Sequence, residues 1–180
     1  MNYDKLIQNI IDQIKEAQIK LGYVRETVRL YYPAESLNQM LETKAKDAKE
    51  LQELLENTAA FSNTVLGKLQ FALSGGRIEV SIPPKGAEYV YREVPEPAFL
   101  MDIIKLFGEN HHCRLADVCA VFDKYSKDYV CEKMPEGMDF DYVMYFRDST
   151  IDAYYYCIRE EMGHTIYHRF TKEDYLALLE

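Results

Sequence analysis

The stretch LQFALSGGRIEVSI, residues 69–82, constrains the fold of this chain more than any other segment. Alternating apolar residues flank Gly75 and Gly76, and glycine readily adopts the positive φ angles that a two-residue hairpin turn requires. Such a turn places Phe71 opposite Val80 and brings the apolar residues of both strands to one face. The glycines do not match a phosphate-binding loop, because no GxxxxGK[ST] motif leads into a helix. We therefore expect an antiparallel hairpin at the centre of the chain.

The remaining apolar patterns alternate between helical and strand-like spacing, which predicts an α+β fold. We expect one largely antiparallel sheet of about five to seven strands, with about four or five helices packed mainly on one face. A length of 180 residues is typical of a single domain, here residues 1–180. The predicted helices span residues 3–21, 34–56, 96–108, 114–132 and 171–180, and the predicted strands outside the two hairpins span 26–32, 87–94 and 140–146.

Composition excludes several classes of partner. The net charge is −9 and no block of Lys and Arg interrupts it, which disfavours binding to nucleic acid. The longest apolar run, AYYYCI at residues 153–158, is far too short to span a membrane. The polar N-terminus does not resemble a signal peptide, and the four cysteines form no CxxC pair. We expect a cytoplasmic protein with reduced thiols, no membrane association and no cofactor.

The segment YYYCIREEMGHTIYHRF, residues 154–170, concentrates acidic, basic and imidazole side chains. On a helix, His164 and His168 would share one face and could hold zinc. Gly163 and the many aromatic and β-branched residues instead favour two strands joined by a turn. Four residues along a strand span about 13 Å, too far for both imidazoles to bind one ion. We therefore predict a hairpin and no metal site.

A three-residue loop at 161–163 gives this hairpin its predicted register, with Ile158 opposite Ile166. A two-residue turn would place Arg159 opposite Ile166, and we reject it on that ground. In the chosen register four Tyr and Arg side chains lie on the face opposite the apolar one. Tyr and Arg are enriched at protein interfaces, so this face could bind an acidic protein partner or a second copy. The alternative interpretation is a half-exposed sheet face covered by the protein's own helix or loop, because large aromatic side chains are usually buried within their own chain. The residues of this face are Tyr155, Arg159, Tyr167 and Arg169.

The loop ENHHCRLADV offers a second, chemical possibility. Cys113 follows His111 and His112 and precedes Arg114, near a predicted helix N-terminus. Positive neighbours and a helix dipole lower a thiol pKa, as in reactive cysteines. The alternative interpretation is a polar loop between two helices. Asp139 and Asp141, about 7 Å apart on an extended strand, could form an acid pair, but no other feature of the sequence indicates a sugar cleft.

Three segments carry a resemblance to a known family: RLYYPAESLN, KYSKDYVC and MGHTIYHRFTKEDY. Together they spread over most of the chain, which resembles a small, uncharacterised bacterial domain family found mainly in Firmicutes. The resemblance implies an intracellular bacterial protein built as a single-domain unit. The family has no assigned activity, so the resemblance implies no catalytic residue.

Two hypotheses about function follow. The first is an interaction or regulatory module that acts by binding a protein partner. The second is a small enzyme or ligand-binding protein that uses the loop of His111, His112 and Cys113. A deep pocket that Cys113 lines near His164 or a carboxylate would favour the second hypothesis, and an open surface at Cys113 would favour the first.

Overall fold

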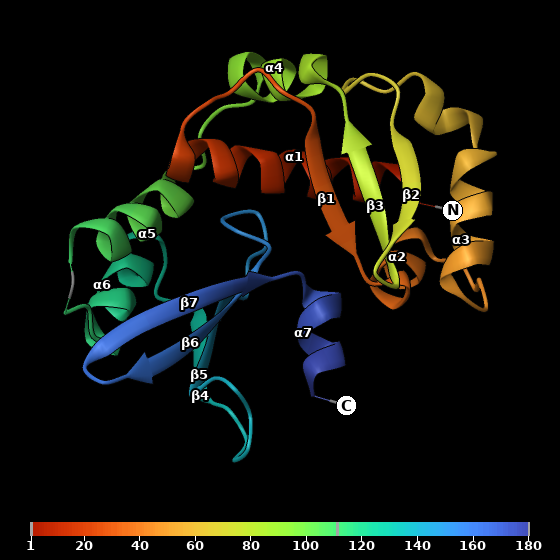
Figure 1. Cartoon of the computed structure of the whole chain (residues 1–180). Coiled ribbons are helices and arrows are strands. Elements are labelled where there is room, and N and C mark those ends of the chain that lie inside the picture. The colour runs from red at the N-terminus through yellow and green to blue at the C-terminus, as the bar shows by residue number, and fades with distance from the viewer. Residues whose placement is uncertain (1, 111, 180) are drawn as a thin grey trace. The chain divides into compact units, whose positions relative to one another are not determined.

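The computed structural model describes residues 2–110 and 112–179. The chain divides into two compact units, Met1–Pro95 and Glu96–Glu180. The α+β class is confirmed, and the strands of the described residues pair antiparallel throughout, in one sheet of three strands and one of four (Figure 1). A single domain over residues 1–180 stays a prediction. None of the helices in the described ranges is long and apolar enough to cross a bilayer.

The first unit buries one face of the sheet β1-β3-β2 against its helices. The first helix begins at the predicted residue, where the Asn2 side chain accepts a hydrogen bond from the Lys5 amide, and it buries the stripe Leu6, Ile10 and Ile14. The elements of the unit are α1 (Tyr3–Leu21), β1 (Val28–Tyr32), α2 (Ala34–Leu41), α3 (Ala48–Glu56), the 3₁₀ helix η1 (Ala59–Ser62), β2 (Gln70–Ser74), β3 (Arg77–Ile82) and α4 (Pro84–Glu93).

The prediction of one helix over 34–56 is wrong, because the chain leaves the helix at Glu42, in the left-handed region with φ 57°. The Asn38 side-chain oxygen accepts hydrogen bonds from the Thr43 hydroxyl (2.8 Å) and the Ala45 amide (3.0 Å). Asp47 then caps α3 by accepting from the Glu50 amide. Residues 42–47 contain no large apolar side chain, so the polar caps decide the local structure.

The glycine hairpin is confirmed in the predicted register. Gly75 and Gly76 form the turn with φ 56° and 80°, and Phe71 pairs with Val80. Strand β1 completes the sheet on the other side of β3, where Leu30 also pairs with Val80. The apolar face of all three strands therefore lies in one core, and the polar residues share the opposite face.

The prediction of a turn at 83–86 and a strand at 87–94 is wrong, since both segments lie in α4. Pro84 occupies the first helical turn, where a missing amide hydrogen is tolerated, and Ala87 and Val90 form the buried stripe. Gly86 packs so closely that a Cβ there would lie 2.5 Å from the Leu66 carbonyl oxygen. The tyrosines of this segment suggested a strand, but helical burial outweighs their intrinsic preference.

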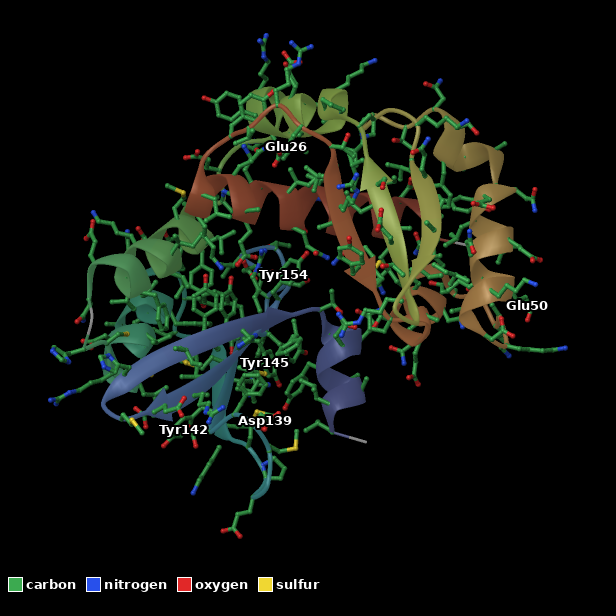
Figure 2. The ribbon with its side chains drawn as sticks, viewed as in Figure 1. Glu26, Glu50, Asp139, Tyr142, Tyr145 and Tyr154 are labelled. Atoms are coloured by element: carbon green, nitrogen blue, oxygen red, sulfur yellow. The ribbon has the colours of Figure 1, made fainter. Side chains whose placement is uncertain are left out.

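The second unit is a four-stranded meander in the order β4-β5-β6-β7, covered on both faces. Helices α5 and α6 cover one face, where Phe99 makes edge-to-face contacts with Phe122, Phe146 and Tyr156. On the other face Tyr155 stacks between Tyr145 and Tyr175, at centroid distances of 4.1 and 4.9 Å; Tyr145 is labelled in Figure 2. The elements are α5 (Ala98–Glu109), α6 (Leu115–Tyr125), β4 (Tyr129–Lys133), β5 (Tyr142–Phe146), β6 (Tyr155–Glu161), β7 (His164–Phe170) and α7 (Lys172–Leu178).

The prediction of one helix over 114–132 is wrong at its end. Helix α6 stops at Tyr125, and Ser126 turns the chain by accepting a hydrogen bond from the Asp128 amide at 3.0 Å. Residues 129–133 form β4, which pairs with β5. Residues 129–133 become a strand because they pair with β5, and helical periodicity alone does not reveal this pairing.

The register predicted for the second hairpin is wrong by one residue. Met162 and Gly163 form a two-residue turn with φ 49° and 81°, and Glu161 pairs with His164. Arg159 consequently pairs with Ile166, the arrangement rejected above. The physical reason is that both side chains lie near the tip, where Ile166 is 42% exposed, so no apolar burial opposes this pairing.

Candidate functional site

The structure does not bring Tyr155, Arg159, Tyr167 and Arg169 to one face. Tyr155 and Arg159 lie on the face that α7 partly covers, and Tyr167 and Arg169 lie on the face toward α5 and α6. A one-residue shift of register moves every side chain of one strand to the opposite face. The shared face predicted for these four residues is therefore wrong.

The Arg169 side chain is buried inside the protein and does not lie on the surface. Its guanidinium lies 3.7 Å from the centre of the Tyr154 ring and 3.9 Å from the Asp152 carboxylate. The side chains of Arg169 and Asp152 are 7% and 5% exposed. Asp152 also accepts hydrogen bonds from the Tyr154 amide (2.8 Å) and the Tyr156 hydroxyl (3.1 Å). A charged pair held by these aromatics fixes the start of β6 to the end of β7.

His112 and Cys113 contact the tip of the second hairpin. The Thr165 hydroxyl donates a 2.6 Å hydrogen bond to the Cys113 carbonyl, and the His112 and His164 rings stack at a centroid distance of 5.8 Å. His111, the third residue of the predicted reactive loop, lies outside the described residues. The structure thus unites the two histidine-bearing segments that the sequence presented separately.

The structure contradicts the first of the two interpretations of Cys113, a thiol with a lowered pKa. The residue is 2% exposed, and burial together with the negative charge of Asp117 raises the pKa of its thiol to about 11. Asp117 occupies the first turn of α6, where its carboxylate accepts a hydrogen bond from the Arg114 amide at 2.8 Å. The carboxylate offsets the effect of the helix N-terminus, so the thiol is protonated at neutral pH.

The other side chains that could bind a metal ion lie apart from one another. Within residues 2–110 and 112–179, no group of three or more His, Cys, Asp or Glu side chains could hold a metal ion. The His168 ring packs against Phe140 and Phe170, at 5.2 and 6.1 Å. Asp141 accepts a hydrogen bond from the Glu160 amide at 2.7 Å, which is a structural role at the start of β5. The absence of bound zinc stays a prediction.

Our sequence predictions did not include a polar surface that lies on the first unit. On the uncovered face of the three-stranded sheet, Arg29, Ser81 and Gln70 pair side by side across β1, β3 and β2. The next row places Tyr31 beside Glu79. We call this the open sheet face; its residues are Arg29, Tyr31, Gln70, Ala72, Ser74, Arg77, Glu79 and Ser81.

Glu79 organises the open sheet face. Its carboxylate lies 3.4 Å from Arg29 Nε and accepts a hydrogen bond from the Ser81 hydroxyl at 3.1 Å. A further hydrogen bond to Glu79, assisted by burial and the negative charge, raises the pKa of Tyr31. Of the three groups that contact Glu79 only Arg29 carries a charge, so these two charges cancel and the open sheet face keeps a net charge of +1, from Arg77.

A cavity of about 600 Å³ adjoins this face, beside β2 and the end of α3. Arg29, Glu79 and Ser81 form one wall, and Lys68 and Gln70 follow β2. Glu56 is the other acid of the lining, and it accepts a hydrogen bond from Gln52 Nε2 at 3.1 Å. Buried side chains form the apolar part of the lining: Leu55, Phe61, Leu69 and Phe71. This size is common for binding cavities.

One sequence signal could have located this face. In VRLYY and RIEVSI the polar residues alternate with apolar ones, which predicts that Arg29, Glu79 and Ser81 point away from the core. The pairing of β1 with β3 is needed to place them side by side, and it joins residues about fifty positions apart, a relation that local patterns do not carry.

Comparison with known proteins identifies the family. Neither the curated proteins nor the solved structures include a match to the chain. The family model described as "Domain of unknown function, E. rectale Gene description (DUF3877)" matches residues 3–179, which include both units. This match confirms the resemblance to an uncharacterised bacterial family, and the chain belongs to that family.

Proposed function

We propose that the protein is an interaction module that binds an acidic protein partner through the open sheet face of the first unit. The observation that carries the proposal is the arrangement of Arg29 and Tyr31 around Glu79 on an uncovered sheet face. Tyr31 is 47% exposed, and the Arg29 side chain is 59% exposed. Exposed Tyr and Arg side chains that are already oriented lose little conformational entropy on binding, and interfaces favour them.

Charge supports an acidic partner. The chain carries a net charge of −9, yet this face presents Arg29 and Arg77, and Lys68 lies in the adjoining cavity. Glu79 lies 3.4 Å from Arg29 and cancels its charge, which leaves the open sheet face with a net charge of +1 from Arg77. A carboxylate from a partner can therefore approach Arg77, while the net charge of the chain disfavours nucleic acid.

We place this binding in the bacterial cytoplasm. All four cysteines, Cys113, Cys119, Cys131 and Cys157, are free thiols, which suits a reducing compartment. A membrane partner is not expected, because the exposed side chains of the face are polar or aromatic rather than aliphatic.

Site-specific cross-linking in the native host tests the surface. A photoreactive phenylalanine analogue is placed at Tyr31 in one variant and at Tyr91 in a control. Tyr91 is a suitable control because it is 54% exposed, lies on α4 and has Arg92 beside it. We expect a discrete cross-linked protein at position 31 and not at position 91, identified by mass spectrometry. No product at position 31, or the same products at both positions, contradicts the proposal; a product with twice the chain mass assigns the surface to self-association.

Charge reversal then tests the chemistry of the partner. With the identified partner, Arg29→Glu combined with Arg77→Glu should weaken binding at least about tenfold, since each lost charge pair at an interface contributes on the order of 1 kcal/mol or more. Arg92→Glu is the matched control and should leave the affinity unchanged. Equal affinities for the two variants, measured by calorimetry, would assign binding to another surface.

A further inference from the structure

Cys119 and Cys131 lie on neighbouring elements that run in opposite directions. Helix α6 and strand β4 are joined by residues 126–128, and the Phe122 and Tyr129 rings pack at a centroid distance of 5.2 Å just beside this turn. Cys119 precedes Phe122 by three residues, which is about 4.5 Å along a helix. Cys131 follows Tyr129 by two residues, about 7 Å along a strand and on the same face. Both cysteines therefore lie on the same side of the ring contact, facing each other.

The electrostatic environment agrees with this geometry. Burial raises the pKa of the Cys131 thiol to about 11, with further contributions from the charge of Cys119 and a hydrogen bond to it. The pKa of Tyr129 also rises, to about 12, through burial and then through Cys119 and Asp123. The Cys119 sulfur thus interacts with both Tyr129 and Cys131, which lie on the same face of β4.

Access differs sharply among the four cysteines. Cys131 is exposed on the edge strand of the four-stranded sheet, and Cys119 is partly exposed. Cys113 and Cys157 are only 2% and 0% exposed. An oxidant in solution can therefore reach Cys131 first, with Cys119 as the neighbouring thiol, while the two buried cysteines serve as internal controls.

We propose that Cys119 and Cys131 are a modification site that forms a reversible intramolecular disulfide with peroxide as the oxidant. The Cys131 thiolate attacks one peroxide oxygen, the O–O bond breaks, and a sulfenic acid and a hydroxide form; the hydroxide takes up the proton that the Cys131 thiol released and becomes the first water. The Cys119 sulfur then attacks the Cys131 sulfur, the S–S bond forms, and the hydroxyl leaves as a second water after taking the Cys119 proton. Two thiols lose two electrons in total, and one peroxide is reduced to two waters. The site is independent of the proposed partner surface, which lies on the other unit.

The raised pKa makes this a slow site at neutral pH. Only the thiolate is nucleophilic, so the rate of disulfide formation should rise about tenfold per pH unit below the Cys131 pKa of about 11. Brief exposure to weak oxidants should leave the pair reduced. The disulfide would join the edge strand β4 to α6 and close a loop of residues 119–131.

The test uses the full chain treated with hydrogen peroxide at about pH 7 and at about pH 9, followed by intact mass and non-reducing peptide mapping. We expect a loss of two hydrogens, a single cross-linked pair of peptides containing Cys119 and Cys131, and full reversal by dithiothreitol. Cys131→Ser and Cys119→Ser should each abolish the cross-link, and the thiols of Cys113 and Cys157 should react with an alkylating reagent only after unfolding.

Three outcomes would overturn the proposal. They are sulfinic acid at Cys131 without a cross-link, a disulfide between two chains through Cys131, and no loss of hydrogens at the higher pH. Circular dichroism of each serine variant checks that a missing cross-link reflects the missing sulfur and not an unfolded chain. The substitution at exposed Cys131 leaves the core unaltered and decides the result if Cys119→Ser fails to fold.

Discussion

The two hairpins of the molecule have the same turn length but differ in how strongly their sequences specify it. In the first, Gly75 and Gly76 occupy both positive-φ positions; in the second, the corresponding residues are Met162 and Gly163. The first hairpin buries one face and leaves the other open, whereas the second is covered on both faces near its base, at Tyr156 and Cys157, and is exposed over residues 159–164. In the first hairpin both the turn residues and the alternation of apolar and polar side chains therefore specify the register. In the second hairpin neither specifies it strongly.

The difference explains why one register could be predicted and the other could not. In β6 the residues facing α5 and α6, such as Tyr156 and Ile158, are apolar, and so are the neighbours Tyr155 and Cys157 on the opposite face. Either register buries apolar side chains, so the alternation of apolar and polar residues does not distinguish the two registers. Met162 is a non-glycine residue in the left-handed region, which is uncommon, so the turn residues themselves specify this turn only weakly.

The largest expected effect distinguishes the two faces of the second hairpin. Arg169→Glu places a second carboxylate beside buried Asp152 and should lower the free energy of unfolding by about 3 kcal/mol or more. Arg159→Glu removes only an exposed contact to Glu161 at 3.4 Å, and should change it by less than about 1 kcal/mol. Urea unfolding measures both values. If both variants lose a similarly small free energy of unfolding, the two arginines lie on one face, as in the register predicted from the sequence.

An intermediate effect is expected at the glycine turn. Replacing Gly75 and Gly76 together by Val forces two β-branched residues to positive φ angles of 56° and 80°, which should destabilise the protein by more than about 1 kcal/mol. A Cβ at either position meets no neighbouring atom, so backbone strain alone is measured. The urea midpoint should fall, and an unchanged midpoint would show that the turn tolerates other backbone angles.

The smallest expected effect is a gain in stability at the second turn. Met162→Asn gives the Asn-Gly pair that this turn type favours, and should raise the free energy of unfolding by about 0.5–1 kcal/mol. Met162 is 96% exposed, so its side chain contributes no packing that the substitution would remove. In a three-residue loop Met162 would not need a positive φ, and the same substitution would bring no gain. Thermal unfolding of the single variant decides between the two turns.

The features that local chemistry determines could be predicted from the sequence. The start of α1, the glycine turn with its register and the start of α7 follow from residues within a few positions of each other, since Asn2 and Thr171 cap the two helices. Features that depend on distant partners could not. The helix predicted over 114–132 runs past the end of α6 because the pairing of β4 with β5 is not visible in helical periodicity, and the open sheet face required the pairing of β1 with β3. An activated thiol at Cys113 stayed one of two interpretations because its burial cannot be deduced from neighbouring residues.

Coverage of both faces of the four-stranded sheet has a consequence for how the chain folds. A slipped hairpin that pairs Glu160 with His164 also buries aromatic side chains, so it competes with the native pairing in the collapsed chain. The Asp152 and Arg169 contact belongs to the native register and stabilises it over the slipped one. Because escape from the slipped state requires the strands to separate, we expect a slow folding phase in this unit that the one-sided sheet of the first unit lacks.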